Sequence, residues 1–162
     1  MEAAKRKEAR NMAEWRLLGQ AWHSHEDLRE ILRVLRGLPR ELADPEIVKK
    51  IGPKLRVFLE ESLPAHFKEE EDESFRRAME CAPAARRQAV LHAINAARQE
   101  HDLMAAISRA IIASLADLSR VPRKAGIERM EALMAGLCDV LARHADKEDR
   151  EVLPYLDLPE DC

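Results

Sequence analysis

Apolar residues recur every three or four positions over four long stretches of the chain, with charged residues between them. Because an α-helix completes one turn in about 3.6 residues, this spacing predicts amphipathic helices. The first predicted helix runs from about Asn11 to Arg36 and ends at Gly37, a residue type common at helix ends. Its apolar face contains Leu18, Trp22, His25, Leu28, Leu32 and Leu35. His25 is therefore predicted to face the protein interior.

The second predicted helix begins after Asp44, a residue type that caps helix starts, and ends at a break over residues 81–83. Pro53 and Pro64 each lack an amide proton, so a kink or a broken start is expected within this helix. Its apolar face contains Leu55, Leu59, Ser62, His66 and Glu70. Of the acidic residues 69–73, only Glu70 is in phase with His66, and the others are predicted to lie in a solvated stretch.

The third predicted helix spans residues 84–118, and the fourth follows a turn at residues 119–122 and stops near Pro154. The apolar face of the third contains Leu91, Ile94, Arg98, His101, Ala105, Ser108, Ile112 and Leu115. The apolar face of the fourth contains Ile127, Met130, Leu133, Leu137, Leu141, His144, Glu148 and Val152. Because the connections are short, the sequence predicts an all-α protein, an up-down-up-down antiparallel four-helix bundle.

Four of the six histidines lie on these apolar faces, and two of them precede a glutamate by four residues, a spacing that puts both side chains on one side of a helix. The set is His25, His66 with Glu70, His101, and His144 with Glu148. Each histidine lies roughly 12 to 22 residues from the nearest predicted break, so all four fall near the middle of the bundle. His23 and His92 are out of phase with the apolar faces and are predicted to face solvent.

Burying these imidazoles and carboxylates without partners would be costly. Each unpaired polar group costs about 1–3 kcal/mol, and an unpaired charge costs more. Six such groups would rival the stability of a whole domain, which is typically about 5–15 kcal/mol. Bound metal ions would use the lone pairs of all six groups. The pattern therefore predicts a metal centre inside the bundle.

Composition and charge narrow the class of protein. The chain has 162 residues, only five glycines and 4% aromatic residues, which favours one helical domain. A net charge of −3 gives no electrostatic reason to expect nucleic acid or a membrane as a partner. No apolar run reaches the roughly 18 residues of a membrane span, and the charged start does not resemble a secretion signal. The cysteines Cys81, Cys138 and Cys162 are too widely spaced to indicate a disulfide framework or a zinc site, so a cytoplasmic location is expected.

The order of these histidines and glutamates resembles the hemerythrin family, and specifically its HHE cation-binding branch. The resemblance covers roughly residues 12–155, and the whole chain, 1–162, is expected to form one such domain. It implies a bundle that holds two non-haem iron ions joined by an oxo or hydroxo bridge. The four histidines would be terminal ligands, and the two glutamates would bridge the ions. Manganese and zinc also accept imidazole and carboxylate ligands and remain alternatives to iron.

Two positions depart from the oxygen-carrying hemerythrins. These have a further histidine four residues after the one on the third helix, where this chain has Ala105. They also use an aspartate five residues after the histidine of the fourth helix, which would select Asp149 here. Helix phase favours Glu148 over Asp149, since Asp149 is rotated by a further 100° or so. The loss of one histidine leaves six protein ligands instead of seven, which predicts an open or water-filled position on each iron and argues against reversible oxygen carriage.

Two functional hypotheses follow from the resemblance. In the first, the open iron position binds or reacts with O2, nitric oxide or peroxide, with electrons from an unidentified donor, so that the protein could be an enzyme. In the second, the protein is a regulator that senses iron, redox state or oxygen without turnover. A metal-free interaction module is disfavoured by the cost of the buried polar groups. Tyr155 is interpreted as a helix-end packing residue, with a phenolate ligand as the alternative.

Overall fold

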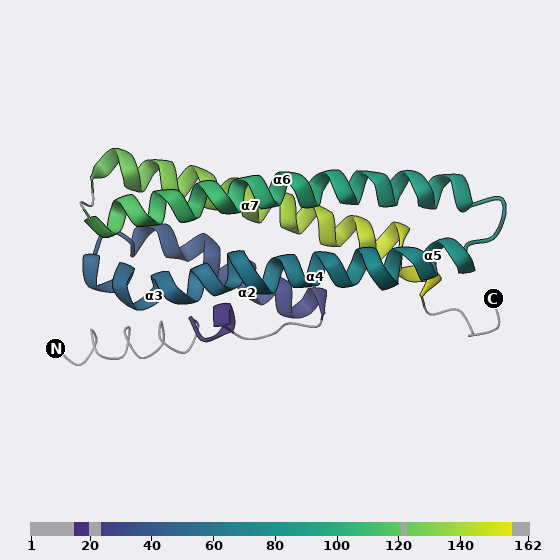
Figure 1. The fold of residues 1–162 in the computed structure, drawn as a ribbon, viewed down its shortest axis with the longest axis horizontal. Coiled ribbons are helices and arrows are strands. Elements are labelled where there is room, and N and C mark those ends of the chain that lie inside the picture. The colour runs from purple at the N-terminus through teal and green to yellow at the C-terminus, as the bar shows by residue number, and fades with distance from the viewer. Residues whose placement is uncertain (1–14, 20–23, 121–122, 157–162) are drawn as a thin grey trace.

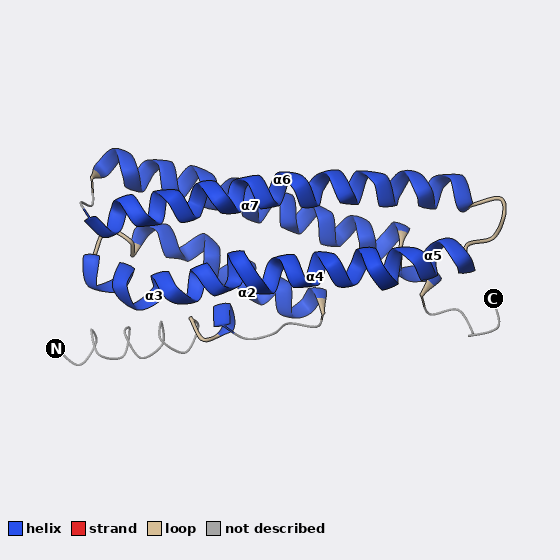
Figure 2. Ribbon diagram, viewed as in Figure 1, coloured by secondary structure: helices blue, strands red, loops and turns tan. Residues whose placement is uncertain are grey.

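The computed structural model describes residues 15–19, 24–120 and 123–156. Within these ranges every regular element is helical, and Figure 2 shows helices joined by short loops without a strand. Four helical rods lie along one long axis (Figure 1). They are α2 (His25–Gly37), a continuous run from α3 to α5, α6 (Arg87–Arg120) and α7 (Lys124–Glu151). The prediction of an all-α helical bundle is confirmed.

The first rod is shorter than predicted, because α2 begins at His25. Ser24 has the extended backbone of an N-cap (φ −146°, ψ 155°), and its hydroxyl accepts a hydrogen bond from the amide of Asp27 at 3.2 Å. The prediction of one continuous helix from about Asn11 to Arg36 is therefore wrong, since Ser24 has an extended backbone. A short 3₁₀ turn, η1 (Leu17–Gly19), precedes this cap. Residues 11–14 and 20–23, including Trp22 and His23, lie outside the described residues.

The second rod combines α-helical and π-helical segments, and its backbone stays helical throughout. Its segments are α3 (Pro45–Val57), η3 (Phe58–Ser62), α4 (Leu63–Glu69), η4 (Glu70–Ser74) and α5 (Phe75–Cys81). Asp44 caps it by accepting a hydrogen bond from the amide of Glu46 at 2.9 Å. The predicted disruption takes the form of π-helical turns rather than a break. The first π turn ends just before Pro64, whose missing amide proton cannot complete the α-helical pattern.

The buried face of α6 is rotated slightly from the predicted one. Leu91 is 41% exposed and Arg98 is also exposed, so both are wrongly predicted to face the core. The buried positions at this end of α6 are instead Val90, Ala93, Ile94 and Ala97. The face is rotated because α6 packs against the second rod as well as along α7. His92 is exposed, as predicted.

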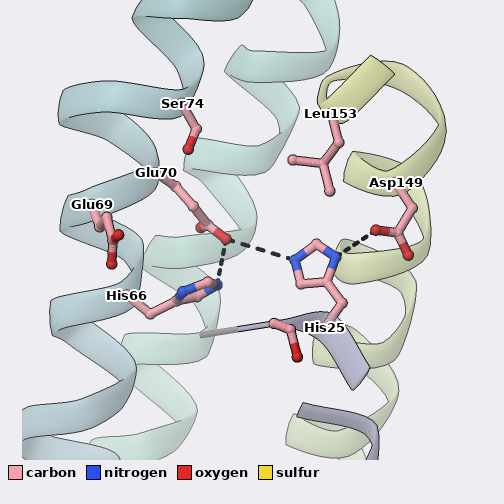
Figure 3. A pocket seen from close by; sticks show the side chains of 8 residues that line it. His25, His66, Glu69, Glu70, Ser74, Asp149 and Leu153 are labelled. Carbon is pink, nitrogen blue, oxygen red and sulfur yellow. Dashed lines mark hydrogen bonds and ion pairs between the residues drawn. The ribbon is translucent and has the colours of Figure 1, made fainter. Parts of the chain in front are cut away.

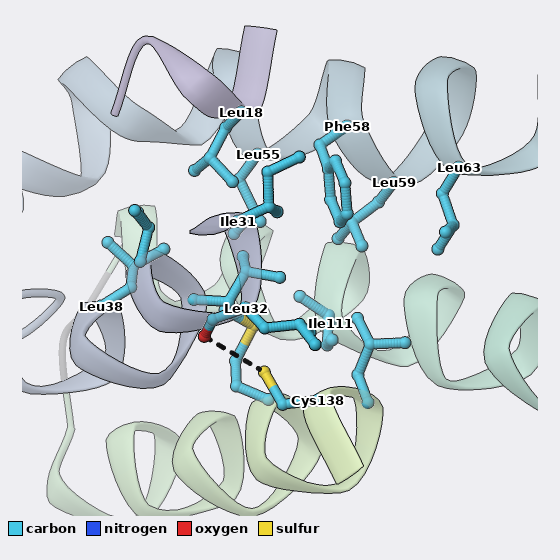
Figure 4. Packing of buried hydrophobic residues seen from close by; sticks show 14 of the residues in the cluster. Leu18, Ile31, Leu32, Leu38, Leu55, Phe58, Leu59, Leu63, Ile111 and Cys138 are labelled. Carbon is cyan, nitrogen blue, oxygen red and sulfur yellow. Dashed lines mark hydrogen bonds between the residues drawn. The ribbon is translucent and has the colours of Figure 1, made fainter. Parts of the chain in front are cut away.

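Two hydrophobic clusters fill the bundle on either side of a polar zone. The larger joins α2, α3 and η3 to α6 and α7, and Figure 4 shows its packing around Leu32, Phe58 and Ile111. The smaller is formed by α5, the start of α6 and Val152. Along each of the last three rods, the candidate site residues lie between members of the two clusters. The site is therefore positioned by apolar packing above and below it.

The cysteines differ from expectation. Cys81 is disulfide-bonded, although the number and spacing of the cysteines did not indicate a disulfide framework. Cys138 is a free, buried thiol whose Sγ donates to the carbonyl of Leu32 at 4.0 Å, and burial raises its pKa to about 11. Cys162 lies outside the described residues. Among the described helices, none is long and apolar enough to cross a membrane. The cytoplasmic location stays a prediction.

Replacing Gly136 by alanine is expected to raise the free energy of unfolding by about 0.5–1 kcal/mol, because glycine is unfavourable inside a helix. A Cβ built on Gly136 in α7 meets no atom within 4 Å. Gly126→Ala is the matched comparison, since its Cβ would lie 3.1 Å from Cδ2 of Leu118 and its gain should be smaller. Urea unfolding of both variants measures the difference. A Gly136→Ala variant less stable than Gly126→Ala would contradict the packing of α7.

Candidate metal centre

The structure brings all six candidate side chains together at one level of the bundle. Their ligating atoms form two groups, each with all atoms within 4.8 Å of one another. One group is Glu70, His101, His144 and Glu148, and the other is His25, His66 and Glu70. The members come from all four rods, so the site exists only in the folded bundle. Their role as metal ligands stays a prediction.

Glu70 lies at the centre of this arrangement and belongs to both groups. Its Oε1 lies 2.5 Å from Nε2 of His66 and 3.9 Å from Nε2 of His25. Its Oε2 lies 3.1 Å from Nε2 of His101 and 3.6 Å from Nε2 of His144. Each carboxylate oxygen thus faces a different pair of imidazoles, and Figure 3 shows the first pair. A carboxylate placed in this way could bridge two cations.

Glu148 makes a second connection between the two histidine pairs. Its Oε2 lies 3.5 Å from Nε2 of His25, and its Oε1 lies 3.7 Å from Nε2 of His144. The side chain of Glu148 is 2% exposed. Burial and the negative charge of Glu70 together raise the pKa of Glu148. Two buried carboxylates therefore face one another across a space ringed by imidazole nitrogens.

The imidazoles of His101 and His144 meet inside the cluster, and each is bound on its outer side by a carboxylate. Nδ1 of His101 lies 2.7 Å from Oε1 of Glu71, and Nδ1 of His144 lies 3.1 Å from Oε2 of Glu100. Because a carboxylate accepts hydrogen bonds, each Nδ1 carries the proton, and Nε2 of a neutral ring then presents a lone pair. The two Nε2 atoms are only 3.2 Å apart. If both rings are neutral, their lone pairs repel one another at this distance, and either a cation or a proton between the two rings removes that repulsion.

The electrostatics of the cluster lead to the same conclusion. Burial alone would lower the pKa of His25, but Glu148, Glu70 and Asp149 outweigh it and raise the pKa to about 10. Burial alone would raise the pKa of Glu70, but the surrounding imidazoles hold it far below its ordinary range. The pKa of His144 is also raised, against the effect of burial, by Glu70 and Glu148. The site therefore attracts positive charge.

The residues present fit a metal. Both carboxylate oxygens of Glu70 and of Glu148 are buried and accept no hydrogen bond from the part of the chain that the structure describes. Imidazole nitrogens lie 2.5 to 3.9 Å from the oxygens of Glu70, but two carboxylates buried beside each other still repel one another, and a cation coordinated by both would offset that repulsion. Imidazole and carboxylate together are a donor set that suits iron, manganese or zinc.

Comparison with known families gives the identity of this bundle. The model of the hemerythrin HHE cation-binding domain matches residues 19–156. The chain belongs to this family. No curated protein and no solved structure matches the chain significantly. This hemerythrin-like domain is expected to bind metal ions, and the buried histidine and glutamate cluster is where it could hold them.

Sequence reasoning did not predict that three carboxylates contact the outer sides of the histidines in this hemerythrin-like bundle. Glu71 and Glu100 bind His101 and His144 as described above. Glu71 belongs to the predicted solvated stretch and is 38% exposed, but it also contacts a histidine. Asp149, the alternative ligand to Glu148, instead binds Nδ1 of His25 at 2.7 Å, on the side away from Glu70 (Figure 3). Each of the three lies beside an inward-facing residue in the sequence, and this adjacency is the signal that could have found them.

Aromatic residues hold the ring of His101 from two sides. Phe67 stacks on it with ring centroids 4.1 Å apart and planes 12° apart, and Phe75 lies parallel at 6.0 Å. This stacking leaves the imidazole little freedom to rotate. Tyr155 is half-buried and packs against the smaller hydrophobic cluster, in agreement with its interpretation as a helix-end packing residue.

A cavity of about 320 Å³ opens onto one side of the cluster. His25, His66 and Glu70 line its inner wall, and the remaining lining residues are Ser24, Glu69, Ser74, Asp149 and Leu153. Figure 3 shows these side chains around the space beside Glu70. The other group is enclosed, since His101 is 5% and His144 is 1% exposed. The two halves of the cluster thus differ in access: one faces a cavity and the other is sealed.

Proposed function

We propose that this protein is an up-down-up-down four-helix bundle that holds two iron ions in its core and binds a small ligand at one of them. The observation that carries the proposal is the position of Glu70, whose two buried oxygens face separate imidazole pairs. In this proposal Glu70 and Glu148 bridge the ions. His25 and His66 hold one ion, and the remaining two histidines hold the other.

The cavity supports assigning the ligand position to the ion held by His25 and His66. With Glu70 and Glu148 as bridges, each ion would have two histidines and two glutamates, so the two ions differ in access and not in donor number. His25 and His66 line the cavity, whereas the other two histidines are enclosed. When bound, iron supplies a Lewis acid and an electron donor or acceptor to such a molecule. Glu69 and Asp149 make the cavity acidic, which favours neutral ligands over anions. O2, nitric oxide and hydrogen peroxide are small, neutral molecules of this kind.

Metal analysis and absorption spectroscopy of the purified protein test this proposal. We expect two iron ions per chain and an absorption in the near ultraviolet that is absent from the metal-free protein. Nitric oxide added without oxygen, and peroxide added separately, should each change the spectrum. A Ser74→Leu variant should keep its iron but react more slowly, because the larger side chain fills the cavity beside Glu70. Purified protein without iron would contradict the metal site. Equal reaction rates for the unaltered protein and Ser74→Leu would contradict the cavity as the route to the iron.

A regulatory function is the second candidate, because the cluster takes members from all four rods. Metal occupancy would then control how firmly the rods hold together, and a change in occupancy or redox state could be transmitted to a partner. Sustained consumption of nitric oxide or peroxide with an added reductant would favour an enzyme. Binding without turnover, together with iron-dependent stability, would favour a regulator.

A further inference from the structure

Three carboxylates lie outside the histidine cluster, and each binds the outer ring nitrogen of one histidine. Asp149 lies 2.7 Å from Nδ1 of His25. Glu71 and Glu100 make the same contact with two further histidines, at 2.7 Å and 3.1 Å. All three carboxylates are partly exposed, with side-chain exposures of 33%, 38% and 28% respectively. They form a layer between the buried cluster and solvent.

Each of these hydrogen bonds crosses from one rod to another. Asp149 of α7 binds a histidine of α2, Glu71 of η4 binds one of α6, and Glu100 of α6 binds one of α7. In every case the carboxylate is the sequence neighbour of an inward-facing residue: Glu71 follows Glu70, Glu100 precedes His101 and Asp149 follows Glu148. One step along a helix turns the side chain by about 100°, from the core toward the adjacent helix. In each pair of neighbouring residues, one side chain therefore belongs to the buried cluster and the other binds a histidine on an adjacent rod.

We propose that Asp149, Glu71 and Glu100 are positioning residues that select Nε2 of His25, His101 and His144 as the metal-binding atom and add negative charge behind each ring. This inference rests on the proposed metal site. A carboxylate that accepts a hydrogen bond from Nδ1–H fixes the tautomer, orients the ring and makes the opposite nitrogen more basic. The added negative charge favours the more highly charged oxidation state of the metal.

Arg29 holds the best-placed of these carboxylates and provides a matched control. Its Nη2 donates to Oδ2 of Asp149 at 2.7 Å and to Oδ1 of Asp146 at 3.2 Å. Both aspartates are on α7 and bind the same arginine, but only Asp149 of the two also binds His25. Replacing Asp146 thus disturbs the same arginine without touching a histidine.

The test compares Asp149→Ala, Asp149→Asn and Asp146→Ala with the unaltered protein. Ferrous iron added without oxygen is titrated against a coloured chelator, and the midpoint potential is measured on iron-loaded samples. We expect Asp149→Ala to bind iron about 10- to 100-fold more weakly. Removing the negative charge should also raise the midpoint potential of Asp149→Ala. Asp149→Asn should recover part of the lost affinity, because its amide oxygen still accepts a hydrogen bond from Nδ1–H. Its midpoint potential should be raised as well, because its side chain is neutral. Asp146→Ala should change neither property.

Two kinds of failure are distinguishable. If the unaltered protein bound no iron, the proposed function would fail, and this inference with it. If the unaltered protein bound iron and Asp149→Ala matched Asp146→Ala in affinity and potential, only the positioning role would be overturned. Glu71→Ala and Glu100→Ala extend the test to the enclosed histidines, with the exposed Glu73→Ala and Asp102→Ala as their controls. Urea unfolding of the metal-free variants separates a lost ligand orientation from a general loss of stability.

Discussion

Replacing Glu70 by glutamine is expected to remove both metal ions from the protein, whereas replacing its neighbour Glu69 should leave both in place. Glu70 is the residue shared by the two groups of ligating atoms, and its oxygens face different histidine pairs. Glutamine has nearly the same shape, but its amide is neutral and offers one oxygen, so it cannot bridge two cations. The loss of affinity should exceed the about 10- to 100-fold that is typical of residues outside the coordination sphere.

Metal analysis after purification and after reloading measures this effect. Glu69→Gln is a strict control, because Glu69 lines the same cavity and is also acidic, but it is exposed and does not belong to either group. Circular dichroism of both variants checks that the helices remain. A folded Glu70→Gln variant that kept both ions would refute the bridging role of this glutamate.

Removing the metal is expected to destabilise the protein by several kcal/mol. A ligand that binds the folded chain alone adds about 2.7 kcal/mol at 100 times its dissociation constant and about 4.1 kcal/mol at 1,000 times. The metal-free bundle must also keep the carboxylates of Glu70 and Glu148 buried next to each other, at 5% and 2% exposure. Urea unfolding with and without a strong chelator measures the difference.

The same unfolding experiment on Glu70→Gln is the control for the chelator. Its free energy of unfolding should not depend on the chelator, because it has no bridged ions to lose. The metal-loaded protein and the protein stripped by the chelator could prove equally stable. In that case the metal would not hold the four rods together. The regulatory hypothesis would then lose its physical basis.

The helical fold and the inward direction of the key histidines could be predicted from sequence because both depend on local periodicity. A repeat of 3.6 residues selects helices, and it places His66 with Glu70 and His144 with Glu148 on shared faces. Prediction failed where a single interaction outweighed periodicity. The apolar pattern runs across residue 24, yet Ser24 has an extended backbone and its hydroxyl caps the start of α2, so no helix runs through this position. The burial of Leu91 was wrongly predicted. Periodicity shows how often buried residues recur along a helix, but it locates the centre of the buried face only approximately.

The site shows the same division. The sequence by itself determined which residue types face inward, because that direction depends on each helix alone. Only the tertiary structure decided which oxygen of Glu70 meets which histidine, and that Asp149 binds His25 from 124 positions away. Such contacts depend on the rotation and the axial shift of one helix against another. Those quantities are set by side-chain packing across the whole bundle, and no local pattern in the chain encodes them.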